Sequence, residues 1–335
     1  MITESHSALS SADEKGLTEN SRYRVLSLLG SGGLSAVYLA RDEELSRDVA
    51  LKVTRGPEGT SEWARTRLWF EAEITAGLEH PGVVPVYGRK FGRSGNPYFT
   101  MRCVRGETFA DVSDKYHATL SVSDRGGVLR RLIDRLVDVC YTVNFANDQG
   151  VIHRDLTPRN IMLGCHGETV VVDWGLARLL NGSEDGPWGM ANSEGPSPRA
   201  GLSRTRLGKS IGTPRYMSPE QAEGDWDRLG ATTDVFGLGA TLYRLLTGRA
   251  PFDHEDSSVS QDKATRVDCP APRRVNRKIP AALEAVCLKA MMVEPEARYP
   301  SAIAMGDDLA RWVAGERISL SLVATRREWE RKTGR

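Results

Sequence analysis

HRDLTPRN at residues 153–160 and DWG at residues 173–175 are the two most informative stretches of this chain. They place three oxygen-bearing side chains, Asp155, Asn160 and Asp173, on expected loops. Carboxylate and amide oxygens are ligands of hard cations such as Mg²⁺, and a carboxylate can also accept the proton of a substrate hydroxyl. Taken singly, each of these residues more often caps a turn. Together they predict a site for a cation and a hydroxyl substrate.

A glycine-rich stretch, GSGGLSAV at residues 30–37, lies between two expected strands. Glycine has no Cβ, so the backbone N–H groups of such a turn can approach a phosphate chain closely. The alternative is a flexible hairpin without a ligand, because short glycine motifs are common. Both interpretations stay open on this stretch alone.

A lysine, Lys52, ends the apolar run VALK at residues 49–52. A lysine in a strand usually lies on a solvated face, and a buried one needs a counter-charge. Glu71 lies 19 residues later (71 − 52) on an expected helix and is the predicted partner. Glu73 points about 200° away from Glu71 around the same helix and is the weaker candidate.

These four motifs, in this order, resemble the signature set of the protein kinases: glycine-rich loop, strand lysine, catalytic loop and metal-binding aspartate. Residues 212–220, GTPRYMSPE, resemble the end of an activation segment. Residues 234–239 resemble the start of the central helix of the large lobe, and Arg298 resembles the usual partner of Glu220. The resemblance covers roughly residues 23–313, and within the family the chain is most similar to bacterial serine/threonine kinases of eukaryotic type.

The resemblance implies an α+β, bilobal protein-kinase-like fold, with a small β-rich N-terminal lobe that holds one helix and a larger α-helical C-terminal lobe. The hydrophobic pattern agrees, because short strands precede the middle of the chain and helical periods follow. We expect a disordered polar tail at residues 1–20 and an N-terminal lobe at residues 21–104. The C-terminal lobe would follow at residues 105–313, with an activation segment at 173–220, and a basic C-terminal extension at residues 314–335.

Several local predictions follow from the pattern of apolar residues. The apolar run at residues 83–87 predicts a strand. The stretches at 181–203 and 253–278 are rich in Gly, Ser, Pro or other polar residues and are predicted as loops. Apolar stripes of helical period predict helices at 128–143, 235–246, 283–291 and 302–312.

The resemblance implies a role for each residue of the site. Lys52 would hold the α- and β-phosphates of ATP and pair with Glu71. Asp155 would accept the hydroxyl proton of a protein substrate, while Asn160 and Asp173 would hold Mg²⁺, with Mn²⁺ as the alternative ion. The nucleotide would also contact the glycine-rich loop, the gatekeeper Met101 and the walls of the adenine site, through Gly30, Ser31, Gly32, Gly33, Leu34, Ser35, Val37, Ala50, Met101, Arg102, Val104 and Met162.

The resemblance also implies control through the activation segment. Arg154, directly before the catalytic aspartate, could bind a phosphate on that segment. Thr205 is the first choice for the phosphorylated residue, with Ser203 and Ser210 as rivals. Thr213 would lie beside the catalytic loop, as it does in serine/threonine kinases. Autophosphorylation would use a transient dimer.

Four positions depart from the family pattern. Ser35 stands where the third loop glycine is usual, Trp174 where phenylalanine is usual, and Ser218 where alanine is usual. Thr157 replaces the lysine that serine/threonine kinases carry two residues after the catalytic aspartate, to touch the γ-phosphate. Arg159 occupies a position where many tyrosine kinases carry arginine, and as a further candidate catalytic residue it could supply the missing charge.

Three functions compete for this sequence. The leading one is an ATP-dependent serine/threonine protein kinase. A pseudokinase or nucleotide-binding scaffold is favoured by Thr157, Ser35 and Trp174, but it is opposed by the complete set Lys52, Glu71, Asp155, Asn160 and Asp173. A small-molecule kinase of related fold is disfavoured, because such enzymes generally lack the 212–220 segment and its Arg298 partner.

Composition excludes several other classes. The 335 residues include 45 Lys plus Arg and 44 Asp plus Glu, for a net charge of +1, which provides no field to attract nucleic acid or an anionic membrane. No apolar run approaches the ~18 residues of a membrane span. The five cysteines include no C-x-x-C pair and predict free thiols in a reducing cytosol. We therefore expect a cytoplasmic chain whose partners are proteins with Ser or Thr hydroxyls, not nucleic acid.

Overall fold

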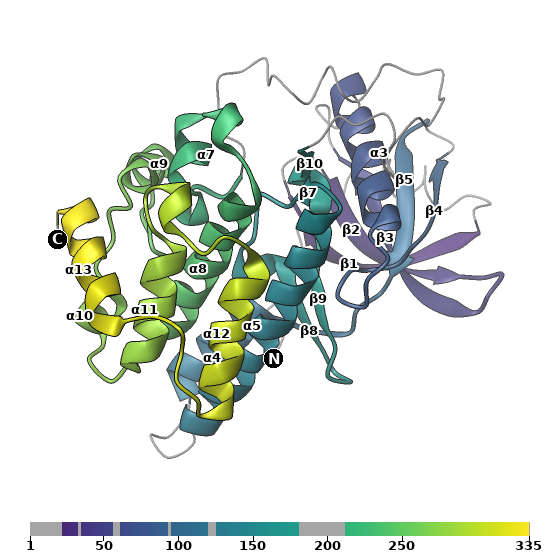
Figure 1. Cartoon of the computed structure of the whole chain (residues 1–335). Coiled ribbons are helices and arrows are strands. Elements are labelled where there is room, and N and C mark those ends of the chain that lie inside the picture. The colour runs from purple at the N-terminus through teal and green to yellow at the C-terminus, as the bar shows by residue number, and fades with distance from the viewer. Residues whose placement is uncertain are drawn as a thin grey trace. The chain divides into compact units, whose positions relative to one another are not determined.

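The computed structural model describes residues 22–32, 35–55, 61–92, 95–119, 125–180 and 212–334. The described residues fall into two compact units. The first unit contains the described residues up to Glu79 together with Val84–Val104, and the second contains His80–Val83 and the described residues from Arg105 onward. The first unit holds a five-stranded sheet with one helix, whereas the second holds most of the helices with two small sheets (Figure 1), which confirms the predicted α+β class. The predicted tail at 1–20 and loop at 181–203 lie outside the described residues.

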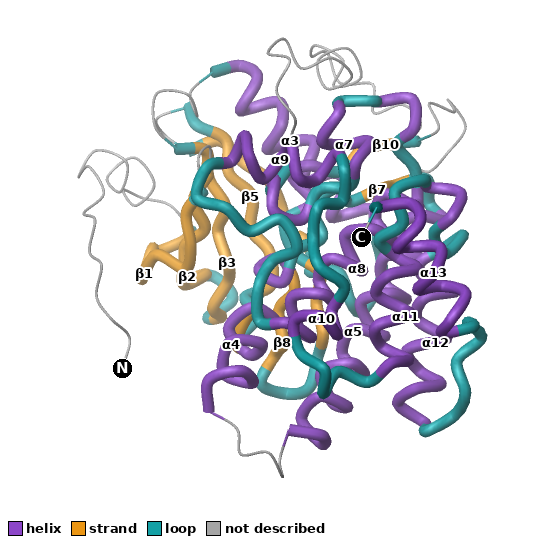
Figure 2. The backbone as a smooth tube through the Cα atoms, turned by 90° about the vertical axis from the view of Figure 1, so that its left-hand side faces the viewer, coloured by secondary structure: helices purple, strands orange, loops and turns teal. Residues whose placement is uncertain are grey.

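The first unit is built on a five-stranded antiparallel sheet in the order β1-β2-β3-β5-β4 (Figure 2). Every second residue of β2 is buried, as expected for a strand with one face on a core. That face includes Tyr38, which belongs to a cluster with Leu51 and Tyr98. The strands are β1 (Tyr23–Ser31), β2 (Ser35–Asp42), β3 (Arg47–Thr54), β4 (Val86–Phe91) and β5 (Pro97–Arg102).

One helix, α3 (Glu62–Gly77), belongs to the first unit. The Ser61 side chain caps its first turn by accepting a hydrogen bond from the backbone. Leu68 of α3 and Phe99 of β5 are both buried and share a hydrophobic cluster. Glu71 is buried as well, so α3 carries a carboxylate into the interior of this unit.

The strand predicted at 83–87 is wrong in its position. The structure has β4 at Val86–Phe91 instead. Pro85 precedes it, and proline has no backbone N–H to contribute to a β-ladder. The apolar run therefore straddles a break that hydrophobicity alone does not reveal.

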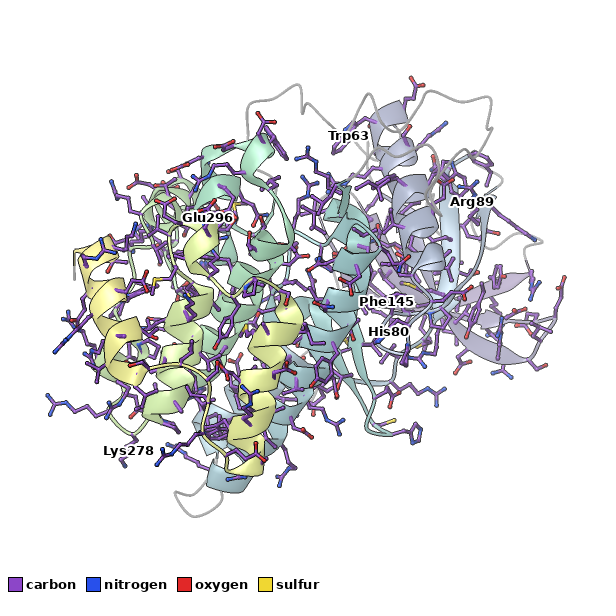
Figure 3. All side chains as sticks on the ribbon, in the orientation of Figure 1. Trp63, His80, Arg89, Phe145, Lys278 and Glu296 are labelled. Atoms are coloured by element: carbon purple, nitrogen blue, oxygen red, sulfur yellow. The ribbon has the colours of Figure 1, made fainter. Side chains whose placement is uncertain are left out.

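The segment His80–Val83 packs on the second unit. The ring of His80 stacks on the ring of Phe145, with 5.0 Å between their centroids (Figure 3). The Gly82 carbonyl accepts a hydrogen bond of 2.8 Å from the Val171 amide, and Val83 forms a parallel bridge with Val171. These contacts, not chain order, assign the segment to the helical unit.

The helix α8 (Ala231–Thr247) is the centre of the second unit. Its residues are buried on nearly every side. A Cβ on Gly239 would lie 2.7 Å from the Cβ of Ala290, so glycine permits the close approach of α8 and α11. The other helices are α4 (Phe109–Thr119), α5 (Arg125–Asp148), α7 (Pro219–Glu223), α9 (Ser257–Thr265), α10 (Pro272–Val275), α11 (Ala281–Ala290), α12 (Ala302–Ala314) and α13 (Leu322–Thr333).

Short strands and single turns of 3₁₀ helix position the two polar stretches. Strand β7, which pairs with β10, ends directly before His153. Strand β9, an edge strand of the sheet β6-β8-β9, ends directly before Val172. The strands are β6 (Gly106–Thr108), β7 (Val151–Ile152), β8 (Ile161–Gly164), β9 (Thr169–Val171) and β10 (Arg178–Leu179). The 3₁₀ turns are η1 (Pro158–Asn160), η2 (Trp174–Leu176), η3 (Pro214–Tyr216), η4 (Trp226–Arg228) and η5 (Pro295–Ala297).

The loop predicted at 253–278 is wrong, since this stretch contains α9 and α10. Asp256 caps α9, with its Oδ1 atom 2.8 Å from the Ser258 amide nitrogen. Only Ser260 and Ala264 of α9 are buried. A short polar helix with two small buried residues has no apolar stripe, so the pattern of apolar residues cannot predict it.

Helix α13 lies within the C-terminal extension and packs beside α11 in Figure 1. Trp329 is only 1% exposed. Arg326 places a guanidinium nitrogen 3.5 Å from the Glu284 carboxylate on α11. The basic end of the chain is thus anchored to the helical unit through one aromatic side chain and one ion pair.

None of the five cysteines, all of which lie in the described part of the chain, forms a disulfide. Burial raises the pKa of the Cys140 and Cys287 thiols, so these two are inert core residues. Among the described residues, no helix is both long and apolar enough to cross a membrane.

Candidate active site

The loop that carries Asp155 is held by the side chain of Asp234, which lies in the first turn of α8. Oδ2 of Asp234 accepts hydrogen bonds of 2.9 Å from the His153 amide and from Asn147 Nδ2. Its Oδ1 accepts one of 2.9 Å from the Arg154 amide. Arg154 has φ 67°, a left-handed conformation that costs a non-glycine residue of order 1–3 kcal/mol. The Asp234 carboxylate therefore offsets and fixes a strained backbone directly before the catalytic position.

His153 is fully buried and links the two polar stretches. Its Nδ1 atom accepts a hydrogen bond of 3.2 Å from the Asp155 amide. The proton therefore lies on Nε2, which donates to the Val172 carbonyl at 3.2 Å. The Trp174 ring lies 4.6 Å from the imidazole, so the tryptophan that replaces the usual phenylalanine packs on His153.

The Asp155 carboxylate is oriented from two sides. Its Oδ2 accepts a hydrogen bond of 3.0 Å from Asn160 Nδ2, which also donates to the Asp155 carbonyl at 2.8 Å. Its Oδ1 accepts one of 3.0 Å from the Thr213 amide. Gly212 has φ 131°, a conformation that favours glycine, and leads into this contact. The stretch 212–220 is thus joined to the catalytic loop through Asp155 itself.

Asn160 and Asp173 have a donor set that fits a hard cation. The Asn160 side chain donates its two hydrogen bonds to Asp155 through Nδ2, and its Oδ1 is the type of oxygen that binds a hard cation. The Val172 amide donates to the Asn160 carbonyl at 2.9 Å, so the backbone places exposed Asp173 beside Asn160. Among the described residues, no three His, Cys, Asp or Glu side chains form a metal site, so Mg²⁺ would need further oxygens, as phosphates provide.

Lys52 and Glu71 form a buried ion pair within the first unit. Nζ of Lys52 lies 2.5 Å from Oε1 of Glu71, and each side chain is 7% exposed. Glu73 instead pairs with Arg89 at the surface. The helical spacing therefore predicted correctly that Glu71, and not Glu73, pairs with Lys52.

The predicted nucleotide-binding residues are divided between the two units. Within the first sheet Val37 is paired with Lys52, and Ala50 with Met101. Two guanidinium nitrogens of Arg102 are buried without a hydrogen-bond partner among the described residues. Gly30, Ser31, Gly32, Ser35 and Val104 belong to the first unit, Met162 to the second, while Gly33 and Leu34 lie outside the described residues.

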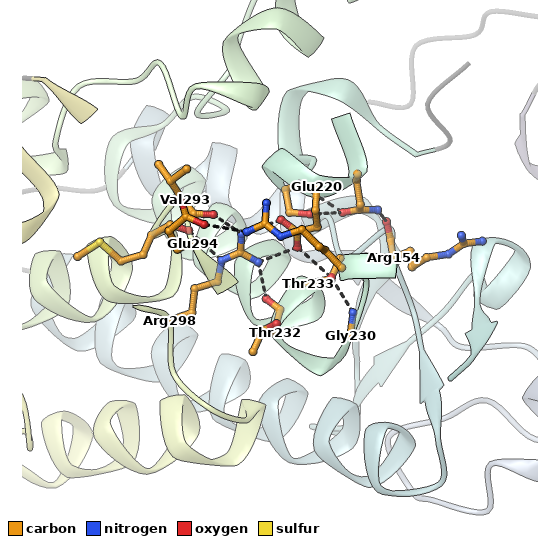
Figure 4. Close-up of polar contacts among 12 residues, drawn as sticks. Arg154, Glu220, Gly230, Thr232, Thr233, Val293, Glu294 and Arg298 are labelled. Carbon is orange, nitrogen blue, oxygen red and sulfur yellow. Dashed lines mark hydrogen bonds and ion pairs between the residues drawn. The ribbon is translucent and has the colours of Figure 1, made fainter. Parts of the chain in front are cut away.

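Glu220 and Arg298 form a fully buried ion pair (Figure 4). Two guanidinium nitrogens of Arg298 lie 2.7 Å from the two carboxylate oxygens of Glu220. The same guanidinium donates to the carbonyls of Met292, Thr232 and Val293 at 2.8–2.9 Å. Burial by itself would raise the pKa of Glu220, but the Arg298 hydrogen bonds and charge outweigh it and lower that pKa.

Comparison with known proteins was consistent with this geometry. Residues 23–317 match the family described as protein kinase domain. The chain belongs to the protein kinase family. It is 36% identical to the serine/threonine-protein kinase PknB of Mycobacterium tuberculosis over 299 residues, which cover 88% of this chain and 43% of that protein.

Other relatives agree. The chain is 31% identical over 299 residues to the serine/threonine-protein kinase PknD of Chlamydia pneumoniae, covering 88% of this chain and 31% of that protein. The chain thus spans less than half the length of these curated relatives. The chain also resembles the solved kinase domain of Mycobacterium tuberculosis PknI, with a TM-score of 0.62 and 22% sequence identity. The matched region includes 91% of this chain and 99% of the PknI domain. That likeness confirms the predicted kinase fold.

The departures from the kinase pattern have distinct environments. Thr157 is buried, and it lines a small cavity with Asp155, Thr213 and Tyr216. Arg159 lies in η1 with an exposed side chain that forms no ion pair with any residue the structure describes.

Sequence reasoning missed the residues that support the kinase catalytic loop. Asp234 was expected only to start a helix, although it binds two backbone amides of the loop and the Asn147 side chain of α5. Gln221 donates a hydrogen bond of 2.7 Å from Nε2 to the Arg154 carbonyl and had no assigned role. The sequence could have indicated a supporting role for Asp234, because a carboxylate at the start of a very apolar helix needs buried hydrogen-bond partners.

Arg154 and Thr205 are the two residues for which the sequence predicts a regulatory role. The Nε atom of Arg154 donates to the Leu176 carbonyl at 2.6 Å, and its guanidinium lies 5.5 Å from the centre of the Trp226 ring. Thr205 lies outside the described residues, so its role in this kinase-family chain stays a prediction.

Burial is the largest influence on the Asp155 pKa and raises it, and the nearby Asp173 charge adds to the rise. Hydrogen bonds from Thr213 and the proximity of His153 oppose it. We therefore expect the Asp155 carboxyl to titrate above the ~3.9 of an unperturbed aspartate. The difference ¹³C NMR spectrum of wild type and Asp155→Asn measures this directly, without interference from the titration of ATP.

The sign of the linked stability effect follows. A raised pKa in the folded state means that ionised Asp155 costs stability above its unfolded pKa and that the cost disappears as the carboxyl protonates. Asp155→Asn should therefore melt at or above the wild-type temperature at pH 7. An Asp155 signal that titrates below ~3.9, or a clearly less stable Asp155→Asn, would contradict this account.

Proposed function

We propose that this chain is an ATP-dependent serine/threonine protein kinase with residues 21–104 and 105–313 as its two lobes. One observation carries the proposal: the Asp155 carboxylate accepts hydrogen bonds from the Asn160 side-chain amide and from the Thr213 backbone amide. The similar proteins of Mycobacterium and Chlamydia are named serine/threonine-protein kinases, which supports the same chemistry here.

In the proposed reaction Asp155 accepts the proton of a Ser or Thr hydroxyl. The hydroxyl oxygen forms a bond to the γ-phosphorus of ATP while the bond from that phosphorus to the bridging oxygen of ADP breaks. Lys52, oriented by Glu71, binds the α- and β-phosphates. Asn160 and Asp173 would hold Mg²⁺, which supplies positive charge to the phosphate oxygens. Because little covalent chemistry falls to the protein, its residues act mainly by positioning and charge.

Phosphoamino-acid analysis tests the proposal. We would incubate the chain with γ-³²P-labelled ATP, Mg²⁺ and a generic basic protein, then identify the labelled residues. Label on Ser and Thr is expected. Label on Tyr alone would contradict the proposed hydroxyl specificity, and nucleotide binding without any label would favour the pseudokinase. The lack of disulfides among the five described cysteines supports a cytoplasmic setting for this reaction.

Arg159→Ala should lower kcat by about 10²–10³, with the KM for ATP little changed. The reason is that the Arg159 guanidinium in η1 is exposed and forms no ion pair with any described residue, so it is available to stabilise charge at the γ-phosphate when Thr157 provides none. Arg159→Lys keeps the charge and is the matched control, which should retain much of the activity. A loss of less than about fivefold for Arg159→Ala, the rate equivalent of roughly 1 kcal/mol, would remove Arg159 from this role.

We also expect autophosphorylation between residues 202 and 213, with Thr205 as the main site, through a transient dimer. A phosphate adds about −1.5 to −2 charge and could bind Arg154. Mass spectrometry of chain incubated with Mg-ATP locates the phosphate, and the Asp155→Asn variant controls for phosphate acquired during expression. An unmodified 202–213 segment in active enzyme would exclude this mode of control.

A further inference from the structure

A pocket of about 570 Å³ lies in the second unit, where α4, α5, α8 and α12 approach the segment before α11. Its volume is that of pockets that enclose small ligands or single side chains. Leu129, Leu246 and Ile279 contribute apolar surface, and Tyr116 and Trp312 add aromatic rings. The pocket can therefore receive a large apolar group.

The charged part of this lining is cationic. Arg125, Arg130 and Lys278 line the pocket, and none of its described lining residues is acidic. Figure 3 shows Lys278 at the lower end of the second unit, and its exposed ammonium forms no ion pair with any residue the structure describes. Arg274 and Arg277, just before it in sequence, are exposed as well. We name Arg125, Arg130 and Lys278, with the apolar surface between them, the cationic pocket.

The cationic pocket is separate from the catalytic loop. Asp234 near the start of α8 binds that loop, whereas Leu246 near the end of α8 lines the pocket. The two residues are 12 positions apart (246 − 234), which corresponds to about 18 Å along a helix. A ligand in the pocket would therefore leave Asp155 accessible to its own substrate.

We propose that the cationic pocket binds an acidic peptide segment of a partner protein, with one large apolar side chain inserted between Trp312 and Leu129. The charges decide the class of partner, since cations on α5 and on the segment before α11 match several carboxylates along an extended chain better than one anionic head group. A membrane fits less well, because its surface engages protruding apolar side chains, and here they line a concave surface.

The proposal is tested by direct binding without ATP, so its outcome does not depend on phosphate transfer. The probe is a short fluorescein-labelled peptide of Glu and Asp around one central Phe, followed by fluorescence anisotropy. Lys278→Glu and Arg125→Glu should each weaken binding at least about tenfold, which is about 1.4 kcal/mol. Arg331→Glu is the matched control, because Arg331 is an exposed α13 residue outside the pocket and gives the same change in net charge.

Two further probes define the specificity. A peptide with Phe replaced by Ala should bind more weakly, and one with Lys in place of Glu and Asp should not bind. Melting curves confirm that each charge-reversal variant is folded. The proposal is overturned if the wild-type chain does not bind the acidic peptide, if Arg331→Glu weakens binding as much as Lys278→Glu, or if phosphatidylserine vesicles bind and the peptide does not.

Discussion

Glu220→Ala should lower the free energy of unfolding by about 3–5 kcal/mol, because it leaves the Arg298 guanidinium buried without its anion. The Arg298 side chain is 0% exposed and the Glu220 side chain 1%, so water cannot replace the lost carboxylate. The cation would keep its hydrogen bonds to backbone carbonyls and its contact with the Phe236 ring, but it would have no counter-charge. Urea unfolding followed by tryptophan fluorescence measures the loss.

The matched control is a salt bridge of the same type at the surface. Arg228 lies 2.8 Å from Glu294, with side chains 38% and 44% exposed. Glu294→Ala should therefore cost only about 0–1 kcal/mol. The double variant Glu220→Leu/Arg298→Met should recover part of the loss, since it removes both charges. Equal effects of Glu220→Ala and Glu294→Ala would refute a structural role for the buried pair.

This pair also predicts a response to acid. The Glu220 pKa is lowered in the folded state, so its contribution to stability is present above the unfolded value of ~4.3 and is lost as pH falls through the folded pKa. The difference in the free energy of unfolding between wild type and Glu220→Ala should therefore become smaller as the pH falls below the unfolded pKa and through the folded pKa of Glu220.

Lys52→Met should lower kcat by at least about 10²-fold, because it removes a preorganised cation from the phosphates. On the sequence alone, this change is expected to leave the melting temperature almost unaltered, since the lysine orients phosphates and fills no core. The burial of the Lys52–Glu71 pair predicts a different result for stability. Glu71 would remain buried and lose the cation 2.5 Å away, so stability should fall as well.

A second variant separates the two effects of Lys52→Met. Lys52→Met/Glu71→Leu removes both charges and should regain stability but not activity. Steady-state kinetics and urea unfolding on the two variants distinguish catalysis from folding. A Lys52→Met enzyme that keeps more than about a tenth of wild-type kcat would exclude Lys52 from phosphate binding.

Much of the site was predictable because its chemistry rests on residue types at fixed spacing. A lysine in an apolar strand and a glutamate on one helical face were enough to predict the pair of Lys52 and Glu71. The order of the motifs likewise predicted the kinase fold and the partnership of Glu220 with Arg298. The roles of these residues in transfer remain proposals.

Other features were not predictable, for physical reasons. The support of Arg154 by Asp234 depends on contacts 80 residues apart in the chain, which no local period encodes. The helix α9 has too few buried residues to produce an apolar stripe. The burial that makes Lys52→Met destabilising is likewise a property of the packed unit and not of the motif.

The central claim is that Asp155 is the base for phosphate transfer to a hydroxyl, and paired measurements on Asp155→Asn test it most directly. Calorimetry gives the affinity for Mg-ATP, and ³²P incorporation into a basic protein gives kcat. We predict similar affinities for the two proteins and a kcat at least about 10²-fold lower for Asp155→Asn. If Asp155→Asn retained more than about a tenth of the wild-type kcat at the same affinity, Asp155 would not be the base.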